Sequence, residues 1–260
     1  MALFSTIKHY LWRVLTERMH LDFTLRSGIR IIVRNYADWC TYNDLFVNGE
    51  YREAMDDAIA EWTPSAAKDR LCVLDLGANT GYFTLQMADT FLHRCPVGNL
   101  MIRPVEASPQ VAEELQRRLV IPRERVDVKI TNGLAGKREG SARLNLGKED
   151  TVNFVSDGDG DGEQWDAKRG TQMVRYTDLD LLTAEMPVVH LIKCDIEGSE
   201  YAFLDNYVGL LGKTRRIVIE FHTAFGDVAL AMEKLRGMGF LKVKVLRESP
   251  LAPTIYFSRA

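Results

Sequence analysis

The sequence predicts an α/β fold with a mostly parallel sheet, and three observations support this. Short apolar runs at residues 71–76, 99–105 and 188–194 have the composition of buried parallel strands. Apolar residues at helical spacing follow each run, so strands and helices alternate along the chain. Acidic residues stand in or at the ends of these runs, where the ligand crevice of such a sheet forms.

Length and charge favour a globular enzyme. The 260 residues suit one α/β domain with an extension, and we divide them into an N-terminal extension, residues 1–62, and a main domain, residues 63–260. A net charge of −3 gives no large basic surface for nucleic acid. No apolar run reaches the length of a membrane span. We therefore expect neither a nucleic-acid partner nor a transmembrane segment.

The cysteines indicate a reducing compartment. The four cysteines are scattered with no C-x-x-C pair, and Cys72 and Cys194 lie in predicted buried strands. The first 19 residues are too polar for a signal peptide. These features predict reduced thiols in a cytoplasmic protein.

The N-terminal extension is predicted to hold a helix, a hairpin and a second helical stretch. Residues 3–19 carry one apolar face, and the region up to residue 34 is basic. A membrane-surface helix is one reading of this pattern, but packing against the domain or in a homodimer is the more common outcome. Residues 21–26 and 29–34 read as a hairpin, and residues 39–62 as mostly helical. We expect the aromatic residues of that stretch to fill the core.

A glycine turn follows the first predicted strand and opens a helix. Glycines let a backbone approach a ligand closely, and a helix N-terminus offers free N–H groups. The dinucleotide fingerprint G-x-G-x-x-G fails here because Asn79 takes the place of its second glycine, and a phosphate-binding loop would need a lysine. The candidate cofactor residues of this motif are Asp75, Gly77, Ala78, Asn79, Thr80, Gly81, Tyr82 and Phe83.

A second loop belongs to the same candidate pocket. Glu106 ends the strand at residues 99–105, and a carboxylate there accepts hydrogen bonds from both ribose hydroxyls of a nucleotide. Ala107 follows it, and Ser108 and Pro109 begin the next helix. A third strand is expected at residues 126–130.

The stretch at residues 137–175 is polar and irregular, with one or two edge strands expected. Residues 157–162 begin like a calcium loop. The twelfth position is Lys168 instead of a bidentate glutamate, so we expect an acidic loop and no metal site there.

The second informative block contains the candidate catalytic residues. The run at residues 188–194 leads into Asp195, Glu197 and Gly198, and a fifth strand at residues 216–222 carries Glu220 and His222. Side chains alternate along extended strands, so Glu220 and His222 should point the same way, as should Asp195 and Glu197.

Several motifs together resemble the FkbM-type family of class I S-adenosylmethionine-dependent methyltransferases. They are VLDLGANTGYF, VEASP, NGLAG, the T-D-L-D before the fourth strand, IKCDIEGSE and VIEFH. The resemblance implies a Rossmann-like, mostly parallel seven-stranded sheet with helices on both faces, closed by an antiparallel hairpin at residues 240–247 and 253–258. It also implies bound S-adenosyl-L-methionine, with Asn132 and Gly133 beside its adenine and residues 39–62 as a substrate lid.

The reaction implied by the resemblance is methyl transfer to a hydroxyl of a small molecule such as a sugar or polyketide, in natural product biosynthesis. An unactivated alcohol needs a base. His222 is the best base by its ordinary pKa, with Asp195 or Glu220 orienting it. Lys193 is the last candidate, expected to point away from the pocket or to lie beneath it. A rival route uses Asp195, Glu220 and His222 as ligands of Mg²⁺ or another divalent cation.

Two other functions compete with this one. The first is a non-catalytic scaffold that binds S-adenosylmethionine, against which the intact motif acids and glycines argue. The second is a nicotinamide-dependent oxidoreductase, which the missing dinucleotide fingerprint disfavours.

Overall fold

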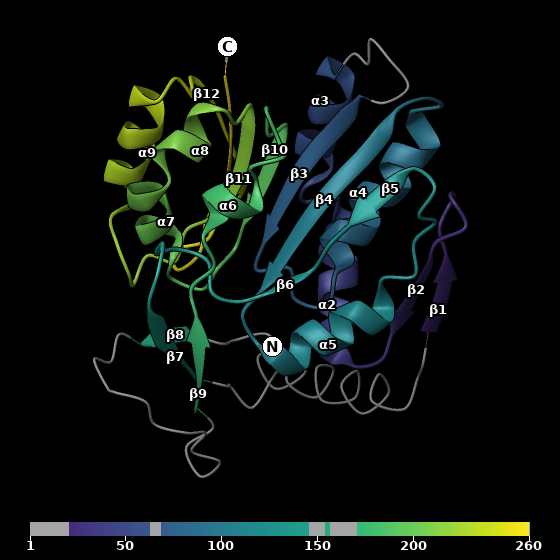
Figure 1. Ribbon diagram of the computed structural model, residues 1–260, viewed down its shortest axis with the longest axis horizontal. Coiled ribbons are helices and arrows are strands. Elements are labelled where there is room, and N and C mark those ends of the chain that lie inside the picture. Colours follow the sequence, from purple (N-terminus) through teal and green to yellow (C-terminus); the bar gives the residue numbers. More distant parts are fainter. Residues whose placement is uncertain (1–20, 63–68, 146–153, 157–170, 260) are drawn as a thin grey trace, which may run out of the picture.

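The main sheet has the predicted α/β architecture (Figure 1). The computed structural model describes residues 21–62, 69–145, 154–156 and 171–259. Seven strands run in the order β12-β13-β11-β10-β3-β4-β5, and the short strand β6 (Thr131–Asn132) pairs with β4. The mostly parallel, seven-stranded Rossmann-like sheet is therefore confirmed, with one two-residue strand added.

Five strands of this sheet are parallel where they pair with one another. These are β3 (Arg70–Leu76), β4 (Asn99–Glu106), β5 (Val126–Val128), β10 (Leu191–Cys194) and β11 (Arg216–Glu220). The hairpin of β12 (Lys242–Arg247) and β13 (Thr254–Ser258) adds to β11 in the antiparallel sense, as the resemblance implied.

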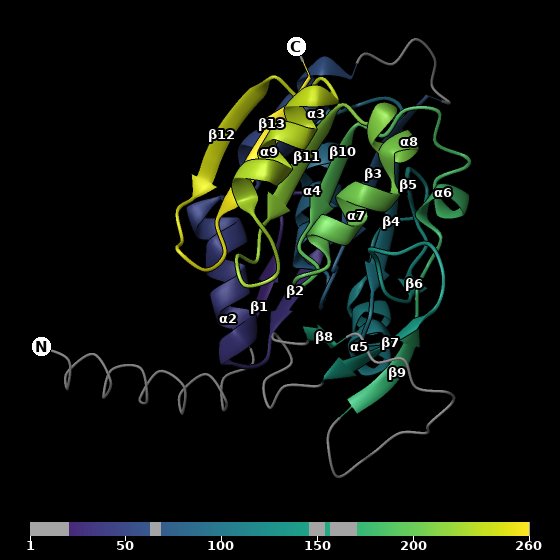
Figure 2. The same ribbon diagram turned by 90° about the vertical axis from the view of Figure 1, so that its left-hand side faces the viewer.

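Helices cover both faces of the sheet, and each face has its own apolar cluster. On one face, α3 (Arg52–Glu61) and α4 (Tyr82–Arg94) pack on residues such as Leu71 and Val73. On the other face lie α6 (Leu179–Leu182), α7 (Glu200–Asn206), α8 (Val208–Gly212) and α9 (Val228–Gly237). Figure 2 shows α7, α8 and α9 together on that side. Because successive β3 side chains alternate between the clusters, the strand is buried on both faces.

The N-terminal extension is part of the same core. The hairpin of β1 (Leu21–Thr24) and β2 (Arg30–Val33) forms as predicted, and α2 (Tyr36–Tyr42) follows it. The π-helix η1 (Asn43–Asn48) continues directly into the turn before α3. Ile29, Ile31 and Leu45 belong to the cluster that covers β3, so this part packs on the sheet. The predicted helix at residues 3–19 lies outside the described residues, and the domain boundary at residue 62 stays a prediction.

A second, smaller sheet contains the strands found within residues 137–175. The strands β7 (Ser141–Asn145), β8 (Phe154–Ser156) and β9 (Thr171–Arg175) pair with one another in the order β8-β7-β9. They lie beyond the carboxyl ends of β3 and β4 (Figure 1). The calcium-like residues 157–162 lie outside the described residues. Strands were expected in this stretch, and β8 and β9 are the edge strands of this small sheet.

Helix starts follow the sequence signals closely. Ser108 caps α5 (Pro109–Arg118) by accepting a hydrogen bond from the Val111 N–H. Asp178 caps α6 in the same way.

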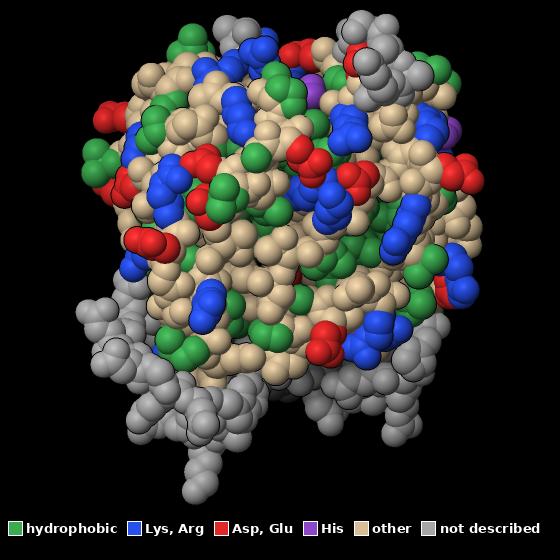
Figure 3. All heavy atoms as spheres, viewed as in Figure 1, with side chains coloured by type: hydrophobic (Ala, Val, Ile, Leu, Met, Phe, Trp, Pro, Cys, Tyr) green, Lys and Arg blue, Asp and Glu red, His purple; other side chains and the backbone are tan. Residues whose placement is uncertain are grey.

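No helix within the described ranges has the length and apolar character to cross a bilayer. Basic and acidic side chains are interspersed over the face shown in Figure 3.

Candidate functional site

A cavity of ≈ 260 Å³ opens at the carboxyl ends of β3, β4, β10 and β11. It gathers most of the residues that the sequence singled out. The predicted residues that line it are Gly77, Ala78, Asn79, Thr80, Tyr82, Phe83, Glu106, Ala107, Gly133, Lys193, Asp195 and Glu220. The edge of the sheet that the strand-end acids indicated is therefore the edge where the cavity lies.

Four predicted residues are not among those that line the cavity, and they are Asp75, Gly81, Asn132 and His222. The exposed Asn132 donates hydrogen bonds from its amide to the carbonyl oxygens of Glu106 and Ala107. It therefore braces the loop after β4. Of the two residues predicted beside an adenine ring, only Gly133 lines the cavity.

The two glycines of the turn are required mainly by the protein itself. Gly77 has a φ of +71°, and a Cβ there would lie 1.7 Å from the carbonyl oxygen of Asp195. Gly81 has a φ of +92°, and a Cβ there would lie 2.5 Å from Cδ1 of Leu115. That both glycines also make room for a ligand stays a prediction. They allow the turn to pass close to β10 and α5, and only Gly77 also faces the cavity.

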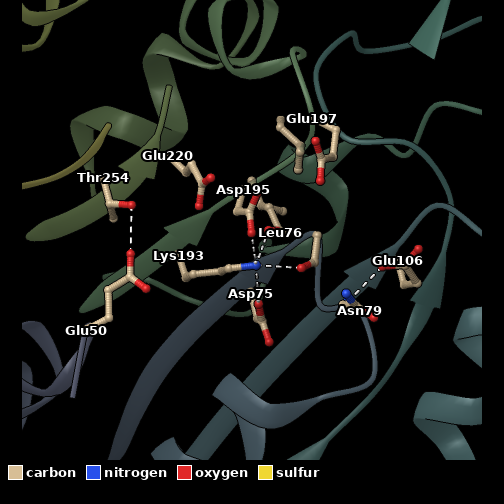
Figure 4. A network of polar contacts seen from close by, with 12 residues as sticks. Glu50, Asp75, Leu76, Asn79, Glu106, Lys193, Asp195, Glu197, Glu220 and Thr254 are labelled. Atoms are coloured by element: carbon tan, nitrogen blue, oxygen red, sulfur yellow. Dashed lines mark hydrogen bonds and ion pairs between the residues drawn. The ribbon is translucent and has the colours of Figure 1, made fainter. Parts of the chain in front are cut away.

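Glu106 connects the turn to β4 (Figure 4). Its two carboxylate oxygens accept hydrogen bonds of 2.8 Å from the Asn79 and Ser108 N–H groups. Burial raises the pKa of this carboxyl, and the two backbone donors oppose that rise. An ionised carboxylate has about four acceptor sites, so about two remain for donors in the cavity. The arrangement fits the predicted contact with two ribose hydroxyls.

Lys193 lies in the cavity wall beneath the glycine turn and does not point away from the cavity. β10 and β3 pair in parallel with Lys193 opposite Asp75, so both side chains lie on one face. The ammonium Nζ donates to the Gly77 carbonyl at 2.5 Å and the Leu76 carbonyl at 3.3 Å. It lies 3.7 Å from Asp75 and 3.5 Å from Asp195 (Figure 4). The buried ammonium of Lys193 therefore connects the glycine turn to the end of β10.

Asp75 lies beneath the cavity and supports the charge of Lys193. Its carboxylate is fully buried, and Oδ2 accepts a 2.7 Å hydrogen bond from the Thr84 hydroxyl. Burial raises the pKa of Asp75, and the Lys193 ammonium opposes that rise. Burial also disfavours the charged form of Lys193, but Asp195 and Asp75 outweigh it and raise the pKa of this lysine. Lys193 is therefore a fixed cation under the turn.

Asp195 and Glu220 bring two carboxylates to the cavity from neighbouring strands. Arg247 from β12 binds Glu220 at 2.6 Å, and Lys193 holds Asp195. Burial and the charge of Asp195 raise the pKa of Glu220 to about 7, against the opposing effects of Arg247 and His222. A carboxyl with a pKa near neutrality can accept a proton at physiological pH. Glu220 therefore has the properties of a general base.

His222 has different partners from those predicted. Nδ1 lies 2.9 Å from Glu200 and Nε2 lies 3.1 Å from Glu197. Burial disfavours the charged ring, but the hydrogen bonds to Glu197 and Glu200 outweigh it and raise the pKa of His222 to about 10. An imidazolium with both nitrogens engaged cannot accept a proton, so this geometry does not favour the predicted role of base.

The turn after β10 explains these partners. The strand ends at Cys194, and Glu197 has a φ of +51°, so side chains no longer alternate as predicted for Asp195 and Glu197. The buried Glu200 accepts hydrogen bonds from the Ile196 and Gly198 N–H groups at 3.3 and 3.0 Å. His222 therefore stabilises a turn that directs Glu197 to the cavity.

The three candidate cation ligands do come together. One ligand atom each from Asp195, Glu220 and His222 lies within 4.8 Å of the others. Each of them already has partners, which are Lys193, Arg247 and the pair of Glu197 and Glu200. A divalent cation would have to displace these groups, so the donor set fits a bound cation poorly.

Some lining residues were missed or assigned only to the core. Tyr51, Leu45 and Thr41 line the cavity from the N-terminal extension, and Glu197 lines it from the turn after β10. Tyr51 is buried as predicted, and its ring meets Phe83 edge to face at 5.5 Å.

A sequence model of one family, described as the methyltransferase FkbM domain, matches residues 75–241. Among curated proteins, none matches the chain.

Three solved structures that are similar to the chain each have 15% sequence identity with it. The N-terminal domain of EvdMO1 with SAH bound has a TM-score of 0.45, with 98% of this chain and 97% of that chain covered. The fibrillarin of Aeropyrum pernix with natively bound S-adenosyl-L-methionine has a TM-score of 0.40, with 80% and 75% covered. A larger EvdMO1 structure has a TM-score of 0.37, and the match covers 80% of this chain and 41% of that one.

Proposed function

The chain belongs to the FkbM methyltransferase family, and from that premise we propose that it transfers a methyl group from S-adenosyl-L-methionine to a hydroxyl of a small molecule. The observation that supports this most is the meeting of three features in one cavity. These are the glycine turn, the partly free carboxylate of Glu106 and the carboxylates of Asp195 and Glu220. The first two suit a nucleoside, and the third suits a hydroxyl that must lose its proton.

The residues divide the cavity into two parts. Gly77, Asn79, Glu106 and Gly133 would hold the cofactor, whose sulfonium supplies an activated methyl group. Asp195, Glu197 and Glu220 face the remaining space and accept hydrogen bonds from the acceptor. Tyr51 and Leu45 cover the cavity from the N-terminal extension and exclude water.

In this proposal Glu220 is the general base. It lines the cavity, and Arg247 holds one of its oxygens while the other is available to the acceptor hydroxyl. Asp195, fixed by Lys193, orients the acceptor oxygen for in-line attack on the methyl group. His222 supports the site indirectly through Glu197 and Glu200.

The test is transfer of a radiolabelled methyl group from S-adenosylmethionine to a panel of sugars, polyols and polyketides. Labelled product with at least one hydroxyl acceptor supports the proposal. Binding of the cofactor without transfer to any acceptor would favour the non-catalytic scaffold. Transfer to amines alone would place the chemistry on nitrogen.

The divalent cation remains a second route, favoured by the proximity of Asp195, Glu220 and His222. Treatment with EDTA followed by Mg²⁺ separates the two routes. We expect activity to survive the chelator, because Arg247 and Lys193 already neutralise the two carboxylates. Loss of activity that Mg²⁺ restores would instead support the cation.

A further inference from the structure

Three neighbouring strands align a row of polar side chains beside the cavity. In the antiparallel pairs of β13, Thr254 stands opposite Glu220 of β11 on one side and opposite Arg247 of β12 on the other. Opposed residues of antiparallel strands lie on the same face of a sheet. Glu220, Thr254 and Arg247 therefore form one cross-strand row.

A β-bulge in β12 places the Arg247 guanidinium in this row. The register of β12 shifts between Val245 and Arg247, so Leu246 is the extra residue. In a regular ladder Leu246 would stand opposite Thr254, and Arg247 would point to the other face. Bulges next to functional sites commonly redirect a side chain in this way.

The same row holds the segment that covers the cavity, which we call the lid segment and define as residues 43–51. It comprises η1, then Gly49 with a φ of +71°, Glu50 and Tyr51. The side chain of Glu50 is only 8% exposed, and it accepts a 2.8 Å hydrogen bond from the Thr254 hydroxyl (Figure 4). Nε of Arg247 lies 3.4 Å from the same carboxylate. A buried carboxylate is costly without such partners, so Glu50 fastens the lid segment to the sheet.

Arg247 thus has two carboxylates, one on the lid segment and one in the catalytic row. It binds Glu220 at 2.6 Å and approaches Glu50 at 3.4 Å. Tyr51, next to Glu50, lines the cavity together with Leu45. Nε faces Glu50 and Nη2 faces Glu220, so a shift of this one planar group alters both contacts together.

We propose that Arg247 is a positioning residue that couples closure of the lid segment to the placement of Glu220. The role of Glu220 as base rests on the proposed function, but the coupling itself does not. Glu50 and Glu220 share one guanidinium, and Thr254 keeps Glu50 within its reach.

Hydrogen exchange of the lid segment tests the coupling without any substrate. In Arg247→Met we expect amides of residues 43–51 to exchange about tenfold faster than in the wild-type chain, because Glu50 loses its cation. Glu50→Gln should have a similar effect, and the double variant should exchange no faster than either single one. Arg247→Lys keeps the charge and should recover part of the protection.

Lys244→Met is the matched control. Lys244 lies in the same strand and pairs with Glu53 of α3, but both side chains are exposed and neither belongs to the row. Exposed pairs contribute little, so lid exchange should stay at the wild-type rate. Equal exchange in Arg247→Met and Lys244→Met would overturn the proposal.

Glu220→Gln provides the readout that a merely structural arginine would not give. Removing the competing carboxylate leaves Arg247 to Glu50 alone, so lid exchange should slow by about threefold. In the Arg247→Met background the same substitution should change nothing. An identical effect of Glu220→Gln in both backgrounds would show that the two carboxylates are not coupled through Arg247. Failure of the proposed function would appear separately, as absence of methyl transfer by a chain whose lid exchange follows this pattern.

Discussion

At the scale of single residues, the surroundings of each titratable group decide its role more than its ordinary pKa does. Histidine is the usual base at neutral pH, yet His222 lies between two carboxylates and holds its proton, with a pKa raised to about 10. Burial and the charge of Asp195 raise the pKa of Glu220 as well, but only to about 7, so this carboxyl can still exchange a proton near neutral pH. The base and the supporting charge have therefore exchanged the roles that residue types alone suggest.

The role of Glu220 predicts a pH profile. The carboxylate is the active form, so turnover should rise with pH through about 7 and then level off, following the pKa of Glu220. Glu220→Gln should lower kcat about 100-fold and remove this rise. Initial rates of methyl transfer across the pH range measure both effects. An unchanged profile in Glu220→Gln, with Glu53→Gln as the surface control, would assign the proton acceptor elsewhere.

The role of His222 predicts a change in stability. Its pKa is raised in the fold, so its contribution is fully present below the ordinary value of about 6.5 and is lost as pH rises through about 10. His222→Gln should lower the free energy of unfolding by about 3 kcal/mol at neutral pH, because Glu200 loses its charged partner. Urea unfolding at several pH values checks this. A folded variant of full stability that has lost turnover would restore His222 as the base.

At the scale of elements, the site depends on how closely the turn after β3 approaches the end of β10. Lys193 bonds the carbonyl of Gly77, and the missing side chain of Gly77 leaves room for the Asp195 carbonyl. Cofactor turn and catalytic strand are thus one packed unit. A substitution that moves the glycine turn should therefore also displace Asp195.

Gly77→Ala tests this unit, with Gly28→Ala as its control. Both glycines have positive φ, but a Cβ at Gly28 meets nothing within 4 Å while one at Gly77 meets the Asp195 carbonyl. Gly28→Ala should cost about 1 kcal/mol of stability from backbone strain alone, and Gly77→Ala about 3 kcal/mol or more. Urea unfolding compares the two. Equal losses would mean that β10 yields easily and that the close approach has no structural importance.

At the scale of the whole molecule, the sequence was sufficient for features encoded in local patterns. Buried strands such as β3 and β10 are mostly apolar runs with a charged residue inside, and Ser108 and Asp178 mark helix starts by their capping chemistry. The position of the cavity could be predicted from these strands, because parallel strands place their carboxyl ends on one edge of the sheet.

Features that depend on distant pairing could not be read in this way. The partners of His222 depend on a turn at Glu197 that leaves the extended conformation, and the place of Arg247 depends on a bulge opposite Thr254. The strands β7, β8 and β9 have no local sign of which sheet they join. The position of Lys193 was left open for a similar reason, since only its register against Asp75 shows which face it occupies.

The central claim is that this cavity binds S-adenosylmethionine through the glycine turn and Glu106. Calorimetric titration with S-adenosylhomocysteine, with NADH as control, tests it most directly. We expect saturable binding of S-adenosylhomocysteine alone, weakened about tenfold in Glu106→Gln because a charged acceptor of hydroxyl hydrogen bonds is lost. Binding of NADH in place of S-adenosylhomocysteine, or equal affinity in Glu106→Gln and the wild-type chain, would contradict this assignment of the cavity.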